Sequence, residues 1–332
     1  MAQLVFVLGA GSSKAYGFPT GEELNDEIQT IVEVALNKSE NAFEHFQILG
    51  AMLREILSSK QDKEALEQFY FQYTHDTFIT IDEFLQGRQG NVLKIGKLLI
   101  SLVILYHEKE EKLTFRKNKD GWYSLFWRQA KESIMNQNVK WTNEVIFLTY
   151  NYDRTLEHFL VHNGSSTYIG EYFKELDCVH HIYGSVGLYP RRRNQQKTPF
   201  GIDFLNKRDE VKNIVKECCE NVLHPSEFAL IENCNVVFSK KRPIKDIIKN
   251  SRYIFLMGCG FHHANMNALG MSELKESSNR PQIFATGFGL KPYQITKIKN
   301  KYPVDNLLDV DCVQFYNEVI ADKLEHVIQK YK

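Results

Sequence analysis

An asparagine and an aspartate follow an apolar run of this 332-residue sequence at a spacing that suits chemistry on a bound ligand. Val145–Thr149 reads as a buried strand, and Asn151 and Asp153 come soon after it. In a parallel sheet, ligands bind at the carboxyl ends of the strands. An amide can donate and accept hydrogen bonds at a ligand, whereas the carboxylate can equally cap the following helix. The pattern predicts a site at Asn151 and leaves both roles open for Asp153.

The beginning of the chain predicts a phosphate-binding turn. The apolar run Leu4–Leu8 breaks directly into Gly9, Ala10 and Gly11. Two glycines after a buried strand let the backbone approach a phosphate closely, and a following helix would direct free N–H groups at that anion. Lys14 stands where the usual fingerprint has a third glycine, so a turn without a ligand remains the alternative.

Hydroxyl groups and a second loop follow that turn. Ser12 and Ser13 can cap a helix or donate hydrogen bonds to phosphate or ribose. Phe18, Pro19 and Thr20 then form a segment with a fixed proline and an aromatic side chain. We expect this segment to close over a ligand that lies on the first turn.

Three later strand ends also carry small or polar residues that can converge on one extended ligand. These candidate binding residues are Tyr183, Gly184, Ser185, Gly258, Gly260, Phe261, Asn265, Gly287 and Phe288. The adjacent His180 and His181 could suggest a metal, but neighbours on a strand point to opposite faces and cannot share one ion. We therefore expect a nucleotide site without a metal.

Bulk composition excludes several classes of function. Lys and Arg balance Asp and Glu at 41 each, which gives no electrostatic case for nucleic acid or an anionic membrane. The chain starts at once with a strand, and Leu98–Leu105 is shorter than the roughly 20 residues that span a bilayer. The six cysteines show no C-x-x-C spacing. We expect a cytoplasmic protein with reduced thiols and Leu98–Leu105 in a buried helix.

Apolar runs alternate with helical patterns and predict an α/β fold: a doubly wound, Rossmann-like, mostly parallel sheet with a helical insertion. The expected strands are Leu4–Leu8, Val145–Thr149, Cys178–Tyr183, Val236–Phe238, Tyr253–Met257, Gln282–Thr286 and Cys312–Phe315. We expect residues 1–332 to form one domain with its core at 1–36, 140–187 and 228–332, a helical insertion at 37–139 and a smaller one at 188–227. The latter contains Arg191–Arg193, which we interpret as a solvated loop, with a phosphate or partner contact as the alternative.

Taken together, the motifs GAGSS, GFPT, TYNYD, HIYGS, GCGFHHANMN and ATGFG resemble, in this order, the landmarks of sirtuin-like proteins. The resemblance covers roughly residues 4–35, 143–187 and 228–318. It is closer to the bacterial sirtuin-like NAD hydrolases of anti-phage defence than to the deacetylases. The paired-cysteine zinc module of the deacetylases is absent, and the chain continues after Pro19 with Thr20 through Leu24 in the form of the defence proteins.

The resemblance implies that NAD is bound in the crevice and that its nicotinamide–ribose bond is cleaved without a metal. By the family pattern, Asn151 positions the ribose and the attacking water, with Asp153 beside it. Gly9, Ala10, Gly11 and Ser12 would hold the pyrophosphate. Gly258, Gly260 and Phe261 would form the second side of the nucleotide site, with Gly287 and Phe288 near the adenine.

The sequence departs from the family at the catalytic histidine, whose place is taken by Tyr183. A histidine with a pKa near 6.5 accepts a proton at neutral pH, whereas a tyrosine with a pKa near 10 does not. His181 lies two positions earlier, on the same face of the expected strand, and would serve as the base if the chain bulges. The alternative is an inactive nucleotide-binding subunit of a heteromeric defence complex.

An enzyme that consumes NAD must be held inactive until it is needed, because constitutive NAD loss would kill the host. The sequence contains no evident sensor domain. We therefore expect a homo-oligomer, or a complex with a sensor protein encoded nearby, as the gate of a toxic anti-phage effector.

Overall fold

The computed structural model describes residues 3–113, 117–137, 144–164, 178–187, 198–223, 244–277 and 279–329. Within this part of the chain, six parallel strands form one sheet in the order β3-β2-β1-β4-β5-β6. The strands are β1 (Leu4–Leu8), β2 (Val145–Thr149), β3 (Val179–His181), β4 (Tyr253–Met257), β5 (Gln282–Thr286) and β6 (Asn306–Leu308). This is the strand order of a Rossmann fold, which confirms the predicted fold class.

The central strand β1 is apolar because both of its faces are covered. All five of its residues are buried, as expected for an interior strand of a parallel sheet. Phe6 pairs in register with Phe147 of β2 and Phe255 of β4, and its ring centroid lies 4.9 Å and 5.1 Å from theirs. These three aromatic side chains fix the middle of the sheet.

The direction of winding reverses beside β1. The chain passes from β1 to β2 on one side and reaches β4 on the other, so β1 and β4 flank the switch point. Ligands of doubly wound sheets bind in the crevice outside the carboxyl ends of the strands at such a point. The carboxyl ends of β1, β2 and β4 are Leu8, Thr149 and Met257, which are in register.

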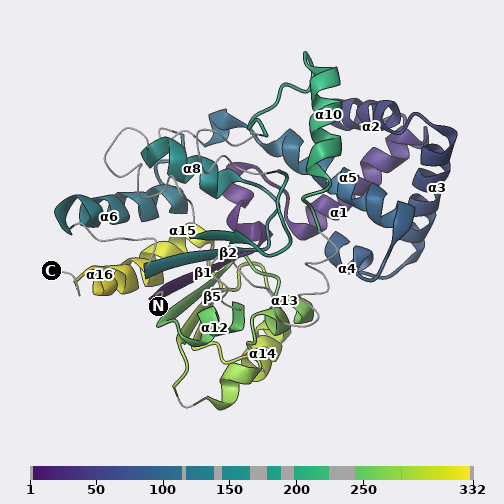
Figure 1. The fold of residues 1–332 in the computed structure, drawn as a ribbon. Helices are drawn as coiled ribbons and strands as arrows, with labels where there is room; N and C mark the ends of the chain where they lie inside the picture. The colour runs from purple at the N-terminus through teal and green to yellow at the C-terminus, as the bar shows by residue number, and fades with distance from the viewer. Residues whose placement is uncertain are drawn as a thin grey trace.

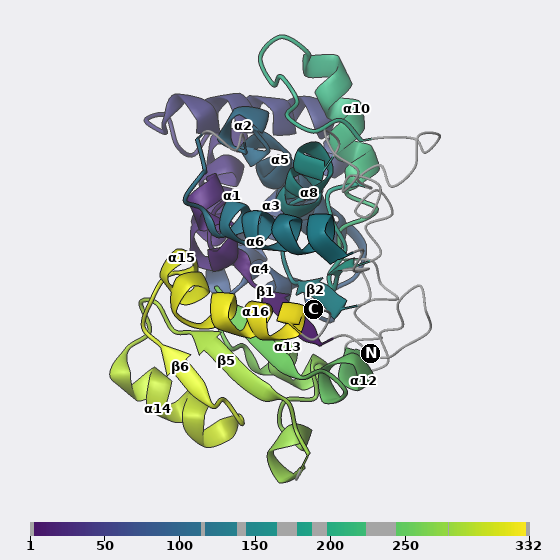
Figure 2. The ribbon, with the colours of Figure 1, turned by 90° about the vertical axis from the view of Figure 1, so that its left-hand side faces the viewer.

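Helices cover both faces of the sheet, with α12 and α14 on one side and α6 and α8 on the other (Figures 1 and 2). A separate helical group, in which α1 packs against α2, α3 and α5, lies between β1 and β2 in the sequence. The helices are α1 (Gly21–Ala35), α2 (Glu44–Ile56), α3 (Lys60–His75), α4 (Ile81–Leu85), α5 (Gly90–His107), α6 (Trp122–Gln137), α8 (Thr155–Gly164), α10 (Arg208–Cys218), α12 (Ile244–Lys249), α13 (His263–Ala268), α14 (Pro292–Lys301), α15 (Cys312–Phe315) and α16 (Ala321–Gln329).

The apolar segment around Leu98–Leu105 lies in α5, as predicted. Among the described residues, α5 is the one helix long and apolar enough to cross a membrane by length and composition, but 67% of it is buried inside the molecule. It contacts α1, α3 and α10. Its packing is that of a core helix.

Two predictions about strands are wrong. Cys312–Phe315 is the helix α15 and not a strand, because Asp311 accepts hydrogen bonds from the N–H groups of Val313 and Gln314 and caps it. The last strand is instead the short edge strand β6. β3 ends at His181, so Tyr183 does not share a strand face with it.

The helix expected directly after the first turn also begins later. Two short 3₁₀ turns, Ala10–Ser12 and Lys14–Tyr16, follow β1, and α1 starts only at Gly21. Thr20 and Glu23 form a capping box that satisfies backbone N–H groups at this helix start. The predicted strand Val236–Phe238 and the residues Arg191–Arg193 lie outside the described residues.

Candidate active site

The turns that follow β1 and β4 are in direct backbone contact. The N–H groups of Gly9 and Gly11 donate to the carbonyl oxygens of Met257 and Gly258, at 2.9 Å and 3.1 Å. A Cβ atom on Gly9 would lie 2.5 Å from the Gly258 oxygen, and one on Gly11 would lie 2.9 Å from the Gly258 Cα. The close approach that requires these glycines is therefore made to backbone. Their contact with a pyrophosphate stays a prediction.

Asn151 lies beside this turn, among hydroxyl groups. Its Nδ2 donates to Oγ of Ser12 at 3.3 Å and to Oγ of Ser13 at 3.0 Å. The side-chain oxygen Oδ1 is buried and has no hydrogen-bond partner among the described residues. A buried acceptor without a partner destabilises the fold. Such acceptors are typical of positions where a ligand or a water molecule binds.

Asp153 has the structural role that the sequence left open. Its Oδ1 accepts hydrogen bonds from the N–H group of Thr155, at 3.1 Å, and from the Thr155 hydroxyl, and so caps the start of α8. Burial raises the pKa of this carboxyl, and the hydrogen bonds from Thr155 and Ser13 offset part of the rise. We call Ser12, Ser13, Asn151, Asp153, Glu157 and His181 the Asn151 cluster.

The side chain of His181 contacts the backbone of Asn151. Its Nδ1 lies 2.7 Å from the backbone oxygen of Asn151, which can only accept, and its Nε2 lies 2.6 Å from Oε1 of Glu157. Burial by itself would lower the pKa of His181, but the carboxylate of Glu157, together with the backbone oxygen of Asn151 and the charge of Asp153, raises it. Burial would likewise raise the pKa of Glu157, and the charge of His181 lowers it. With both ring nitrogens donating, the imidazolium has no lone pair to accept a proton from water.

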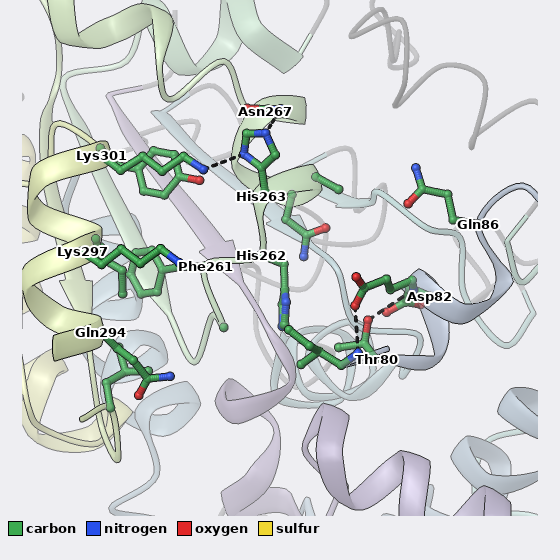
Figure 3. Close-up of a pocket in the computed structure, with 18 of the residues that line it drawn as sticks. Thr80, Asp82, Gln86, Phe261, His262, His263, Asn267, Gln294, Lys297 and Lys301 are labelled. Atoms are coloured by element: carbon green, nitrogen blue, oxygen red, sulfur yellow. Dashed lines mark hydrogen bonds between the residues drawn. The ribbon is translucent and has the colours of Figure 1, made fainter. Parts of the chain in front are cut away.

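An open pocket lies between α4, α13 and α14 (Figure 3), and no residue of the Asn151 cluster is among those that line it. Its volume is about 830 Å³, within the range of small-molecule sites. Four of the predicted residues line this α4–α14 pocket: Tyr183, Gly260, Phe261 and Asn265. Of the other polar residues that line it, His262, His263 and Asn267 belong to the motif GCGFHHANMN but were not predicted as site residues. The sequence analysis did not single out the rest, among them Thr80, Asp82, Glu83, Gln86, Gln294, Lys297 and Lys301.

Tyrosine side chains form the boundary between the cluster and the pocket. The hydroxyl of Tyr183 donates to Oδ1 of Asn265, and the hydroxyl of Tyr150 donates to its backbone oxygen at 2.7 Å. The rings of these two tyrosines lie 5.4 Å apart. Burial, together with the charge of Asp82, raises the pKa of Tyr183 far above its usual value, so the phenol is neutral. Tyr183 is thus a hydrogen-bonding wall.

Asp82 supplies a carboxyl group to the pocket from the start of α4. Its Oδ1 accepts a hydrogen bond from the hydroxyl of Tyr152, one residue after Asn151. Burial raises the pKa of Asp82 to about 6, partly offset by this hydrogen bond. With this pKa the carboxyl changes its protonation state just below neutral pH.

The remaining predicted residues lie apart from the α4–α14 pocket. Phe18 and Pro19 line a smaller cavity of about 400 Å³, and Thr20 caps α1. Gly184 forms a β-bridge with Val222, and the hydroxyl of Ser185 donates to the backbone oxygen of Gly187. Gly287 and Phe288 lie in the loop after β5. Phe288 is 73% exposed. The structure therefore does not gather the whole predicted set around one cavity.

Comparisons of the chain with protein-family models, with curated proteins and with solved structures find no match. The strand order and the site at its switch point define a Rossmann-like α/β protein.

Proposed function

We propose that this protein binds NAD at the carboxyl edge of its sheet and hydrolyses the nicotinamide–ribose bond. The observation that carries the proposal is the side chain of Asn151. The hydroxyls of Ser12 and Ser13 accept hydrogen bonds from its amide beside the switch point, and its Oδ1 is buried with no hydrogen-bond partner in the described part of the chain. Such an oxygen can accept a hydrogen bond from a ribose hydroxyl or from the attacking water.

The reaction requires little of the protein beyond positioning the ribose and the attacking water. Nicotinamide leaves as a neutral molecule from a positively charged ring, and water adds to the ribose carbon to give ADP-ribose, nicotinamide and one proton. The site must hold the ribose, orient the water and offer polarity to the developing oxocarbenium charge. Asn151 serves the first two requirements.

A second candidate is nucleotide binding without hydrolysis, as a subunit of a heteromeric complex. The observation that favours it is the state of the two side chains nearest the family's histidine position. Both nitrogens of His181 are engaged, and the hydroxyl of Tyr183 donates to Asn265. In this arrangement neither side chain is a base.

Within the first proposal the protein is a cytoplasmic toxic effector of anti-phage defence, acting with NAD alone and without direct contact to nucleic acid or membrane. Its activity is gated by self-association or by a sensor protein encoded nearby. The support for this part is the resemblance of the sequence motifs. Expression of the chain alone should leave cellular NAD intact, and the trigger with its partner should deplete it.

The test is release of nicotinamide from NAD by purified wild-type protein and by Asn151→Ala, with and without proteins encoded beside it. We expect the substitution to reduce release at least about 100-fold while the protein stays folded. Asn300→Ala, at an exposed position of α14, is the matched control and should retain the wild-type rate. Undiminished release by folded Asn151→Ala would contradict the site. Binding of NAD without release under every condition would favour the second candidate.

A further inference from the structure

The helical insertion contacts the turn after β1 through two successive residues at the start of α6, Trp122 and Tyr123. Both side chains are fully buried. The indole N–H of Trp122 donates to the backbone oxygen of Ser12 at 3.0 Å, and the backbone N–H of Tyr123 donates to the hydroxyl of Tyr16 at 2.9 Å. The rings of Tyr16 and Tyr123 stack, with their centroids 4.0 Å apart and 8° between their planes. The start of α6 is therefore fixed against the turn that carries the serines bonded to Asn151.

The hydroxyl of Tyr123 reaches the Asn151 cluster itself. Its oxygen lies 3.0 Å from Oγ1 of Thr155. The Thr155 hydroxyl donates its one proton to Oδ1 of Asp153, so it can only accept from Tyr123. Burial and the charge of Asp153 raise the pKa of Tyr123 well above its usual value, and hydrogen bonds with Thr155 and Ser13 offset part of the rise. The phenol is therefore neutral and has a proton to donate.

Two short paths of hydrogen bonds join Tyr123 to Asn151. One runs through Ser13, whose Oγ accepts from Nδ2 of Asn151 at 3.0 Å. The other runs through Thr155 to Asp153, two residues beyond Asn151. The terminal torsion of an asparagine side chain has no sharp preference of its own, so the partners of Nδ2 decide where Oδ1 points.

We propose that Tyr123 is a positioning residue of the candidate site: from the helical insertion it holds Ser13 and Thr155 in place, and through them it orients the side-chain amide of Asn151. The site is then built from three parts of the chain, which are the turn after β1, the segment after β2 and the start of α6. This inference rests on the proposed function for what Asn151 does in hydrolysis. The placement of Asn151 by Tyr123 can be measured without any reaction.

The first test follows the side-chain amide protons of Asn151 by NMR of the full chain, with their signals assigned by their loss in Asn151→Ala. Tyr123→Phe removes only the phenolic oxygen and keeps the ring that stacks on Tyr16. We expect it to shift the Asn151 signals and to speed the exchange of these protons with water about fivefold, because the hydrogen bond that protects them is weakened. Tyr316→Phe, which removes a similarly buried hydroxyl that donates to Gln129, is the matched control and should leave the signals unchanged.

Thr155→Val removes the acceptor of the same hydrogen bond and keeps the backbone N–H that bonds to Asp153. It should change the Asn151 signals as Tyr123→Phe does, and it carries the test if Tyr123→Phe does not fold. Unchanged signals in the folded variant would overturn this inference and leave the proposed function standing.

The second test is nicotinamide release from NAD under the conditions in which the wild-type protein is active. Tyr123→Phe should lower kcat about tenfold, with a much smaller change in KM, because a misplaced amide orients the water poorly. In the Asn151→Ala background the same substitution should have no further effect, since Tyr123 acts through Asn151. A full tenfold effect in that background would overturn the inference. Wild-type protein that releases no nicotinamide under any condition would overturn the proposed function, and the amide signals would still decide this inference.

Discussion

The Asn151 cluster and the α4–α14 pocket lie at the same edge of the sheet but use polar side chains in opposite ways. In the cluster, hydrogen bonds pair most polar groups with one another, as in the contacts of Asp153 with Thr155 and of His181 with Glu157. In the pocket, charged groups such as Lys297 face open volume. The difference teaches that a residue of a type suited to catalysis is not evidence of catalysis when all its hydrogen bonds are made within the folded protein. Within the cluster, two side-chain oxygens are buried without a hydrogen-bond partner among the described residues: Oδ1 of Asn151 and Oε2 of Glu157.

The largest expected effect tests whether the glycines between the two regions serve packing. Gly258 has φ +62°, and a Cβ there would lie 2.2 Å from the backbone nitrogen of Ser12. We expect Gly258→Ala to destabilise the fold by about 3 kcal/mol or more, through left-handed strain plus a backbone clash. Urea denaturation measures the change in the free energy of unfolding.

Gly289→Ala isolates the strain from the clash. Gly289 has φ +76°, and nothing lies within 4 Å of its added Cβ. This control should cost only about 1–2 kcal/mol, the price of a left-handed residue. Equal losses in the two variants would contradict the packing role of Gly258.

The next effect tests the claim that His181 is structural. Removing one member of a buried ion pair costs about 3–5 kcal/mol, because the other charge stays buried alone. We expect His181→Gln to lose stability by about 3 kcal/mol in urea denaturation. His107→Gln, which breaks a more exposed pair with Glu27, should cost less than about 1 kcal/mol. A smaller loss at His181 than at His107 would contradict the account.

The same pair predicts a pH dependence. The pKa of His181 is raised in the folded protein, so its contribution is complete below the unfolded value of about 6.5 and is lost as the pH rises through the folded pKa. The pKa of Glu157 is lowered, so its contribution is present above about 4.3 and is lost as the pH falls. The pair therefore stabilises the fold most between about pH 4.5 and 6.5. Urea midpoints across pH 4–9 should show this dependence in wild type, and Glu157→Gln should flatten it.

Local patterns predicted much of the fold. Leu4–Leu8, Val145–Thr149, Tyr253–Met257 and Gln282–Thr286 were predicted as strands with the bounds observed, because apolar runs of this length between polar segments are typical of buried parallel strands. The edge of the sheet was mispredicted. β6 is three residues long and begins at the exposed Asn306, so it lacks the apolar signature of an interior strand.

The site was predicted only where strand ends define it. Asn151 follows β2 directly, and the pattern of parallel strands places it at the crevice edge. Asp82 lies in a helix more than 60 residues from any motif, and Lys297 lies on a lysine-rich helix surface. Both line the pocket only because of how these helices pack. A lysine every fourth residue on a helix is indistinguishable in sequence from a solvated face. Tertiary contacts, which the sequence does not display, decide that part of the site.

The account depends most on the claim that the dinucleotide is bound at the carboxyl edge of the sheet beside Asn151. Amide hydrogen exchange of the full chain, with and without carba-NAD⁺, a dinucleotide that keeps the pyridinium but resists hydrolysis, tests this claim directly. The account predicts slower exchange at residues 150–152 and at the neighbouring residues 12 and 13, with α2 and α10 unchanged as internal controls. No protection at residues 150–152 at saturating ligand would contradict it.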